Sequence, residues 1–107
     1  MKVEVSIFAK QEVRKTARYI RKEFGEKSKN KFMVEYYHTL QLLATNPLIG
    51  PVEQSLDHFP IEYHSIVVAQ KNKAIYHIES KDLVKIDDFW DCRRDPKALA
   101  DRATEWE

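Results

Sequence analysis

Two histidines and two arginines in the C-terminal part of the chain are of the types that act on phosphodiesters. His64 and His77 fall in neighbouring apolar segments, and Arg93 and Arg94 follow the next such segment. Histidine can move protons near neutral pH, and arginine can hold a phosphate. Because adjacent strands bring distant residues onto one surface, the sequence predicts that an open sheet face carries this group. Exposed histidines and charged turns are also common on ordinary sheets, so a surface without chemistry remains the alternative.

Lys71 and Lys73 extend this group, because they lie at the turn between the two histidine-bearing segments. We expect them to bind a phosphodiester substrate. We expect no metal and no cofactor, because the histidines are scattered without ligand spacing and two glycines cannot form a glycine-rich phosphate loop. Cys92 is the single cysteine, which excludes an internal disulfide and favours a cytoplasmic protein.

The first half of the chain predicts one strand and a pair of helices. Residues 2–8 alternate apolar and polar side chains, as a strand with one buried face does. Residues 10–24 change to a helical period, and Gly25 can end that helix in a left-handed conformation. Ser28 can cap a second helix, which should stop at the residue before Pro47. Two helices with so short a link pack as an antiparallel hairpin.

The second half predicts an antiparallel meander after an irregular loop over residues 46–60. The connecting turns are short enough to make neighbouring strands antiparallel. Residues 66–68 are all apolar, so we expect that strand to be covered on both faces. Asp95 and Pro96 are suited to cap and open a last short helix. The three strands are expected over residues 62–69, 73–79 and 83–90.

These elements predict an α+β fold of order β-α-α-β-β-β with a further helix, in which a helical hairpin packs on a small antiparallel sheet. A chain of 107 residues fits a single domain, residues 1–107. No apolar run approaches the roughly 18 residues that a membrane helix needs, so we expect no membrane partner.

The charge of the chain is unevenly divided, although the formal net charge is only +1. Residues 1–50 hold ten Lys or Arg and five Asp or Glu, whereas residues 51–107 hold eight and twelve. A basic face therefore belongs to the helical half, where it either solvates helix surfaces or attracts an acidic partner. A pI near 7.8 is too low for a general nucleic-acid binder.

Four local signatures, met in this element order, make the chain resemble the RelE/ParE family of bacterial type II toxin–antitoxin toxins. In the first, Leu43, Pro47 and Gly50 meet a Leu-x-x-x-Pro-x-x-Gly pattern that is common in the family. The others are similar to its Tyr-Arg-Ser strand start, its central strand and its Arg-containing terminal strand. The resemblance covers residues 3–99. The signatures are LLATNPLIG at 42–50, YHSIVV at 63–68, AIYHIE at 74–79 and FWDCRRDP at 89–96.

The resemblance implies a toxin that a cognate antitoxin neutralises, as in plasmid-stabilisation (addiction) modules. ParE-like members poison DNA gyrase, whereas RelE-like members cut mRNA in the ribosomal A site. In the RNA-cutting branch, basic residues on the sheet hold the scissile phosphate and assist attack by the ribose 2′-hydroxyl. For that branch His64 would be a proton shuttle or phosphate ligand, and His77 a general acid or base. Arg93 and Arg94 would clamp the phosphate.

Two departures from the family pattern favour the ParE-like branch. His64 stands where close relatives have an arginine, and only Lys71 and Lys73 remain basic around the first sheet turn. The final strand also carries three aspartates, which would repel a nucleic-acid backbone within a Debye length of roughly 8 Å. We therefore expect growth inhibition through binding to a target such as gyrase. A ribosome-dependent mRNA endonuclease and a non-toxic remnant that only binds its antitoxin stay open. The aspartates are Asp87, Asp88 and Asp91.

An antitoxin of this family usually wraps an acidic segment around its toxin. Arg14, Arg18, Arg21 and Lys22 lie largely off the apolar stripe of the first helix, and they could steer such a segment. The open edge of the sheet could also accept an added strand from the partner. A homodimer and a hetero-oligomer with the antitoxin both remain open.

Overall fold

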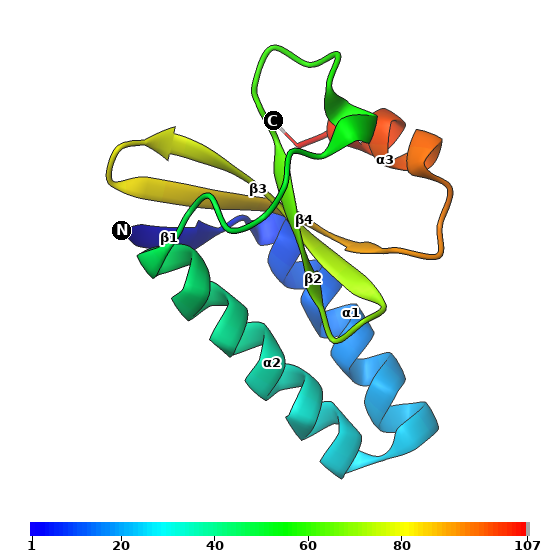
Figure 1. Cartoon of the computed structure of the whole chain (residues 1–107). Helices are drawn as coiled ribbons and strands as arrows, with labels where there is room; N and C mark the ends of the chain where they lie inside the picture. The colour runs from blue at the N-terminus through cyan, green and yellow to red at the C-terminus, as the bar shows by residue number, and fades with distance from the viewer. Residues whose placement is uncertain (107) are drawn as a thin grey trace.

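The structure is a computed structural model that describes residues 1–106, and it contains a four-stranded sheet, two long helices and a short C-terminal helix (Figure 1). This arrangement confirms the α+β fold with a helical hairpin. Within residues 1–106, none of the helices is long and apolar enough to span a membrane. The elements are β1 (Lys2–Val5), α1 (Ile7–Phe24), α2 (Glu26–Thr45), a 3₁₀ turn η1 (Gln54–Leu56), β2 (His64–Val68), β3 (Asn72–Ser80), β4 (Leu83–Asp91) and α3 (Pro96–Ala103).

The sheet has the strand order β1-β4-β3-β2, and it is mixed rather than wholly antiparallel. The strands β2, β3 and β4 form the expected antiparallel meander, with Ser80 opposite Leu83 at the second turn. The strand β1 instead runs parallel to β4, with Lys2 opposite Leu83. A parallel pair needs a long crossover connection, and the helical hairpin with two further strands supplies it here.

The first helix begins earlier than predicted because Ser6 caps it. The Ser6 hydroxyl accepts a hydrogen bond from the Ala9 amide at 3.0 Å and donates one to the Asp87 carbonyl at 3.1 Å. An N-cap residue ends the preceding extended segment, so β1 stops at Val5 instead of continuing to residue 8. The same hydroxyl fastens the start of α1 to β4.

The two helices are joined by Gly25 alone. Its φ of 96° with ψ of 172° is a conformation that glycine adopts readily, and its amide donates to the Arg21 carbonyl at 2.9 Å, so α1 ends at the predicted glycine but not in a left-handed helical conformation. The second helix then starts at Glu26, so the expected cap at Ser28 is wrong. The link is too short to let the helices separate at this end, and they form a tight hairpin.

One face of the sheet packs against this hairpin through apolar contacts. The Phe32 ring of α2 meets the Phe89 ring of β4 edge-on, with the ring centroids 5.8 Å apart. Contacts of this kind bury most of the apolar stripes that the sequence predicts for the two helices. The buried members of this core are Ala9, Val13, Phe32, Tyr36, Leu43, Val68, Ala74, Tyr76, Val84, Ile86 and Phe89.

The opposite face of the sheet is covered as well, so the predicted open face is wrong. The helix α3 and the turn η1 pack there around Trp90, which is almost fully buried. Asp95 and Pro96 start α3 as predicted, with the Asp95 carboxylate accepting a hydrogen bond from the Lys97 amide at 2.9 Å. The buried residues of this second core are Leu56, Tyr63, Ile75, Trp90, Leu99 and Ala103.

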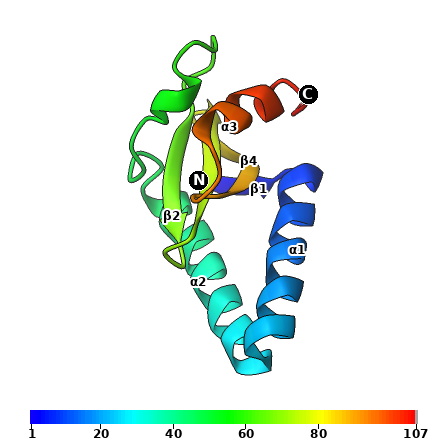
Figure 2. The ribbon, with the colours of Figure 1, turned by 90° about the vertical axis from the view of Figure 1, so that its right-hand side faces the viewer.

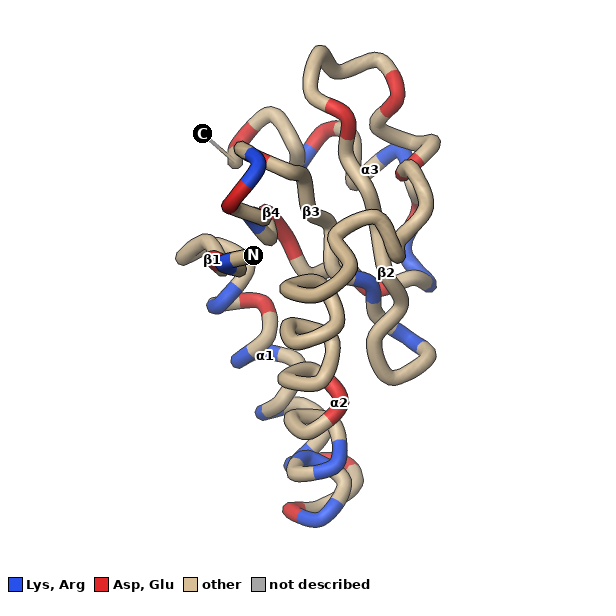
Figure 3. The backbone as a smooth tube through the Cα atoms, turned by 60° about the vertical axis from the view of Figure 1, so that its left-hand side comes forward, with Lys and Arg blue, Asp and Glu red and all other residues tan. Residues whose placement is uncertain are grey.

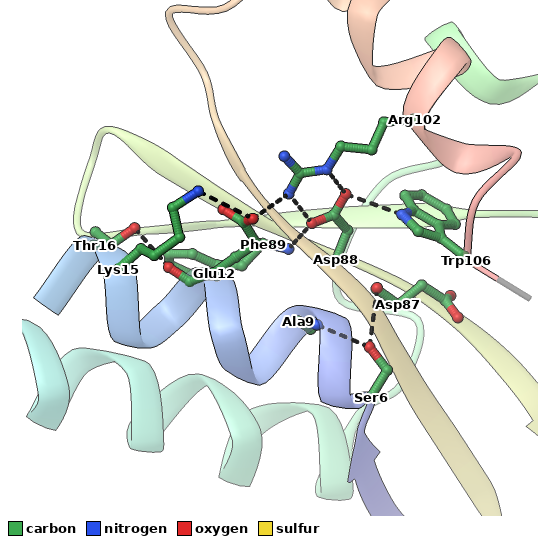
Figure 4. A network of polar contacts seen from close by, with 10 residues as sticks. All are labelled: Ser6, Ala9, Glu12, Lys15, Thr16, Asp87, Asp88, Phe89, Arg102 and Trp106. Atoms are coloured by element: carbon green, nitrogen blue, oxygen red, sulfur yellow. Dashed lines mark hydrogen bonds and ion pairs between the residues drawn. The ribbon is translucent and has the colours of Figure 1, made fainter.

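A buried ionic cluster fastens α3 to the sheet and to α1 (Figure 4). The Asp88 carboxylate is fully buried and accepts hydrogen bonds from the Arg102 guanidinium at 2.6 and 2.8 Å and from the Trp106 indole at 3.0 Å. The guanidinium also lies 3.4 Å from Glu12 of α1. Burial raises the pKa of Asp88, and the Arg102 guanidinium opposes that shift.

The edge strand β2 is only partly covered. Ile66 and Val68 pack on the core beneath the hairpin, whereas Val67 is 60% exposed. The prediction that residues 66–68 are covered on both faces is therefore wrong at Val67. The cause is that α3 and η1 cover the other face near Trp90 and do not reach this part of β2.

Candidate functional site

A cleft of about 740 Å³ lies between the helical hairpin and the turn that joins β2 and β3. We call it the hairpin cleft. Figures 1 and 2 show the tip of the helical hairpin extending past this turn. The walls of the cleft come from the second half of α1, the first half of α2, the β2–β3 turn, and the end of β4 with the residues after it. Its lining includes the aromatic residues Tyr19, Phe24 and Phe32 and the basic residues Lys15, Lys31, Lys71, Arg93 and Arg94.

The β2–β3 turn is held in place beside the end of β4. Ala69 and Gln70 have φ values of 54° and 69°, a region that residues with side chains seldom adopt. This geometry reverses the chain within a few residues, and the Cys92 amide donates a hydrogen bond to the Lys71 carbonyl at 2.8 Å. The turn and the arginines that follow β4 therefore border the same cleft.

Aromatic side chains give the hairpin cleft an apolar wall. Tyr19 and Phe24 lie edge to face with their ring centroids 6.4 Å apart, and Phe24 is 61% exposed. The Lys71 ammonium lies 5.9 Å from the centroid of the Phe24 ring, within reach of a cation–π contact. Phe24 ends the helical period predicted for residues 10–24, but it is not buried, because the last turn of α1 passes beyond the sheet (Figure 1).

Five basic and three acidic residues line the hairpin cleft, so its charge is positive overall. Lys15 and Lys31 line its helical walls, and Arg93 makes a two-pronged contact with Asp91 at 3.0 and 2.8 Å. The hydrogen bonds from Arg93 lower the pKa of Asp91, so this acid stays ionised and offsets the arginine. The Arg94 guanidinium lies 4.2 Å from the centroid of the Trp90 ring. Basic residues around exposed rings suit an acidic ligand with apolar side chains.

His77 lies buried against the second core rather than on an open face. Its Nδ1 lies 2.6 Å from the Asp87 carboxylate and its Nε2 lies 2.8 Å from the Glu79 carboxylate. The hydrogen bond to Asp87 raises the pKa of His77, and the contact with Glu79 adds to that shift, while burial opposes it. Both ring nitrogens are therefore occupied, and a proton could pass to a substrate only after a carboxylate had moved.

His64 is buried beside the chain that follows α2. Its Nδ1 lies 2.9 Å from the Gly50 carbonyl and its Nε2 lies 3.1 Å from Glu62. The Gly50 amide in turn donates to the Tyr76 hydroxyl at 3.0 Å, and the Tyr76 ring stacks on His64. A Cβ at Gly50 would collide with the Ser65 carbonyl. The glycine of the predicted family signature is thus required by close packing.

The four residues predicted to cleave RNA do not come together. A hollow of about 360 Å³ is lined by His64 and His77, whereas Arg93 and Arg94 line the hairpin cleft. Along β3, the position opposite Asp91 lies five residues from His77, which is about 17 Å at 3.4 Å per residue. The histidines and arginines therefore occupy opposite ends of the sheet.

The two predicted substrate-binding lysines also differ in their surroundings. Lys71 lines the hairpin cleft. The Lys73 ammonium donates a hydrogen bond to the buried Glu53 carboxylate at 2.6 Å, and most of its side chain is covered. Because Glu53 already neutralises Lys73, this lysine serves to hold the loop before β2 against β3.

The three aspartates of β4 are paired, which removes one argument against a nucleic-acid ligand. Asp87 contacts His77, Asp88 contacts Arg102, and Asp91 contacts Arg93. The repulsion that the sequence predicts is therefore largely offset inside the protein. The separation of the histidines from the arginines is the stronger structural argument against RNA cleavage.

The predicted antitoxin-binding residues lie outside the hairpin cleft. All four are exposed on α1, where they present positive charge to solvent. Such a face can accelerate the approach of an acidic partner without contacting it in the final complex. The residues are Arg14, Arg18, Arg21 and Lys22.

Sequence reasoning missed the wall of the cleft on the two helices. In the sequence, Tyr19 and Phe24 look like apolar residues of an ordinary amphipathic helix, and Lys15 and Lys31 look like ordinary surface charges. The available signal was an aromatic residue directly before a helix-ending glycine, since such a residue lies at the tip of a hairpin. Among the residues that the structure describes, no group of three or more histidines, cysteines or acids is placed to hold a metal.

Comparison with known proteins concerns the fold. No protein-family model and no curated protein matches the sequence significantly. Among solved structures, a chain of the chromosomal ParDE TA system from P. aeruginosa is similar, with a TM-score of 0.69 and 10% sequence identity. The similarity covers 85% of this chain and 95% of that chain. This protein therefore has the ParE-like α+β fold that the RelE/ParE resemblance predicts.

Proposed function

We propose that this chain is the toxin of a type II toxin–antitoxin pair and that it inhibits growth in the cytoplasm by binding a cellular target. The observation that carries the proposal is the fold, which is shared over 85% of the chain with a protein of a ParDE TA system. The four sequence signatures support it independently, because they lie in the matching order along the same elements.

The hairpin cleft is the proposed docking site for the antitoxin. Its exposed rings, Tyr19 and Phe24, offer apolar contacts, and its lysines offer charge to an acidic segment. The exposed basic face of α1, which includes Arg14 and Arg18, would attract the same segment from a distance. An amphipathic acidic segment would therefore approach along α1 and settle in the cleft.

DNA gyrase is the proposed target, as the ParE-like branch implies. The distribution of the candidate catalytic residues supports binding over RNA cleavage. His77 is enclosed by two carboxylates, and the arginines lie at the other end of the sheet. An mRNA endonuclease would need both groups at one phosphate, because acid–base catalysis requires hydrogen-bond reach. A plasmid-stabilisation role would follow if the pair is encoded on a plasmid.

The first test is expression of the chain alone from a tightly controlled promoter, with DNA and protein synthesis followed by labelled precursors. An early fall in DNA synthesis is expected. An early fall in protein synthesis, with cleaved messages, would instead support the endonuclease. Growth without arrest would contradict the toxin proposal and leave an antitoxin-binding remnant.

The arginines after β4 provide a sharper version of this test. The double variant Arg93→Ala with Arg94→Ala should abolish growth arrest, because it removes the two exposed guanidinium groups beside the cleft. Lys97→Ala is the matched control, since it removes an exposed positive charge at the start of α3. Undiminished arrest by the double variant, at equal protein level, would contradict a role for this end of the sheet.

The proposed docking of the antitoxin can be tested through two rates, the association rate and the dissociation rate. With the acidic protein encoded by a neighbouring gene as ligand, Arg14→Glu with Arg18→Glu should slow association and weaken its salt dependence. Phe24→Ala should instead speed dissociation by about tenfold or more, because it removes an apolar contact in the cleft. Unchanged dissociation from Phe24→Ala would place the antitoxin elsewhere.

A further inference from the structure

The outer face of the second half of α2 differs from the rest of the surface because it carries no Lys, Arg, Asp or Glu. One third of the residues in the chain are charged, at 33%, yet none occurs from Tyr36 to Val52. Figure 3 shows the C-terminal half of α2 and the segment after it without acidic or basic residues. Tyr37 and Leu48 are large exposed apolar residues within this stretch.

Helical spacing places the exposed residues of α2 on one face. Val34, Tyr37, Gln41 and Thr45 follow each other at three or four residues, which is the spacing of neighbours on a helix surface. All four are exposed, and Val34 is 68% exposed. Core residues such as Leu43 lie on the opposite side of the helix. We call this exposed stripe, with Leu48 beyond it, the neutral α2 face.

We propose that the neutral α2 face binds a second copy of this chain, with the two α2 helices antiparallel about a two-fold axis near Gln41. Interface centres are depleted of charged residues, as this face is, and Tyr37 supplies one exposed aromatic ring at its centre. A two-fold contact joins the same patch on both copies. The patch must therefore pack against an identical copy of itself, and a face without charges can do so without like-charge repulsion.

The distribution of charge along α2 favours the antiparallel arrangement. Three lysines and Glu26 lie in its first turns, whereas the last turns carry no charge. At about 1.5 Å per residue the helix is about 30 Å long. An antiparallel pair centred on Gln41 overlaps only the uncharged last turns and keeps the charged first turns of the two copies apart, whereas a parallel pair would place these first turns together. The helix dipoles also oppose each other in this arrangement.

A second copy fits this face better than the acidic antitoxin does. The basic residues that would attract an acidic partner lie on α1 and around the hairpin cleft, which the neutral α2 face leaves free. We expect this face to bury less area than a standard protein–protein interface, which buries about 800 Å² on each partner. We therefore expect a weak dimer, with a Kd on the order of 10–100 μM.

Sedimentation velocity of the purified chain, from about tenfold below to about tenfold above this Kd, tests the proposal without any antitoxin or target. Monomer should convert to dimer across the series, and the equilibrium should change little with salt. A chain that stays monomeric throughout, or that forms larger open assemblies, would overturn the proposal. Growth arrest would be unaffected by either result, so the toxin proposal stands or falls separately.

Charge substitutions at Gln41 locate the contact. Gln41→Glu and Gln41→Lys should each weaken the dimer by at least about tenfold, because like charges would meet near the two-fold axis. A mixture of the two variants should regain dimers, because the charges then attract. Ile7→Glu is the matched control, since Ile7 is 75% exposed and belongs to α1 rather than to α2. Dimerisation that persists in both single variants, or a mixture that stays monomeric, would overturn the geometry.

Discussion

The two faces of the sheet are covered by different kinds of contact. The hairpin side is an apolar core in which rings such as Phe32 and Phe89 meet directly. The α3 side combines a smaller apolar core with buried charges, chiefly Asp88 with Arg102 and His77 with Asp87. Apolar burial is indifferent to pH, whereas ion pairs depend on protonation and on both partners being present. The attachment of α3 to the sheet therefore depends on pH and on both partners of each ion pair being present.

The largest effect should come from Arg102→Met. The substitution leaves the Asp88 carboxylate buried without its cation, and breaking a buried pair in this way costs about 3–5 kcal/mol of unfolding free energy. Urea unfolding measures the loss. The double variant with Asp88→Leu should recover much of it, because neither charge then remains. A single-variant loss below about 1 kcal/mol would remove the distinction between the two faces.

A comparable test on the hairpin side is Leu43→Ala. Leu43 is fully buried, and removing such a side chain costs about 2–5 kcal/mol through lost transfer energy and the cavity left behind. This loss should be the same at pH 6 and pH 9, since burial raises the pKa of Tyr36 and Tyr76, the titratable members of this core cluster, from 10.0 and neither ionises in that range. A loss that varied strongly with pH would show that charge also governs this face.

Gly50→Ala tests the close packing of Gly50 against polar groups at the edge of the hairpin side. The added methyl would collide with the Ser65 carbonyl and with the Tyr76 hydroxyl. Overpacking of this kind costs about 1–3 kcal/mol. Thermal unfolding should show the loss. Gly25→Ala is the contrasting variant, because a Cβ there meets no neighbour and only the positive φ opposes it.

The smallest effect, and the most specific to the α3 side, is the pH dependence from His77. Its pKa is raised above the ordinary 6.5 by the hydrogen bond to Asp87. The folded state therefore holds the proton more tightly than the unfolded state. The stabilisation is complete below pH 6.5 and is lost as the pH rises through the folded pKa.

The gap in unfolding free energy between the parent chain and His77→Gln should be about 1 kcal/mol at pH 6. It should shrink toward pH 9 as His77 loses its proton. His58→Gln is the control, because that histidine is exposed outside the core clusters. A gap that stayed constant or widened with pH would contradict a protonated His77 in the folded state.

The sequence predicted the elements and the hairpin side better than the α3 side. Helical periods, Gly25 and the Asp95-Pro96 pair are local signals, and the structure confirms them. The pairing of Asp88 with Arg102 is not local, because the two residues belong to different elements and each alone reads as surface charge. Without that pairing, the sequence predicted an open sheet face where α3 packs. The hairpin cleft was missed for the same reason, since its walls meet only after folding.

The parallel pair of β1 and β4 sets the order in which the nascent chain can fold. Lys2 pairs with Leu83, so the first strand emerges from the ribosome long before its partner. Contacts of such wide sequence separation slow folding. The α1–α2 hairpin can form early, but its sheet cannot close until β4 has been made. The sheet is therefore completed only after β4 has left the ribosome, which leaves an interval in which a partner can meet the first half of the fold before it is closed.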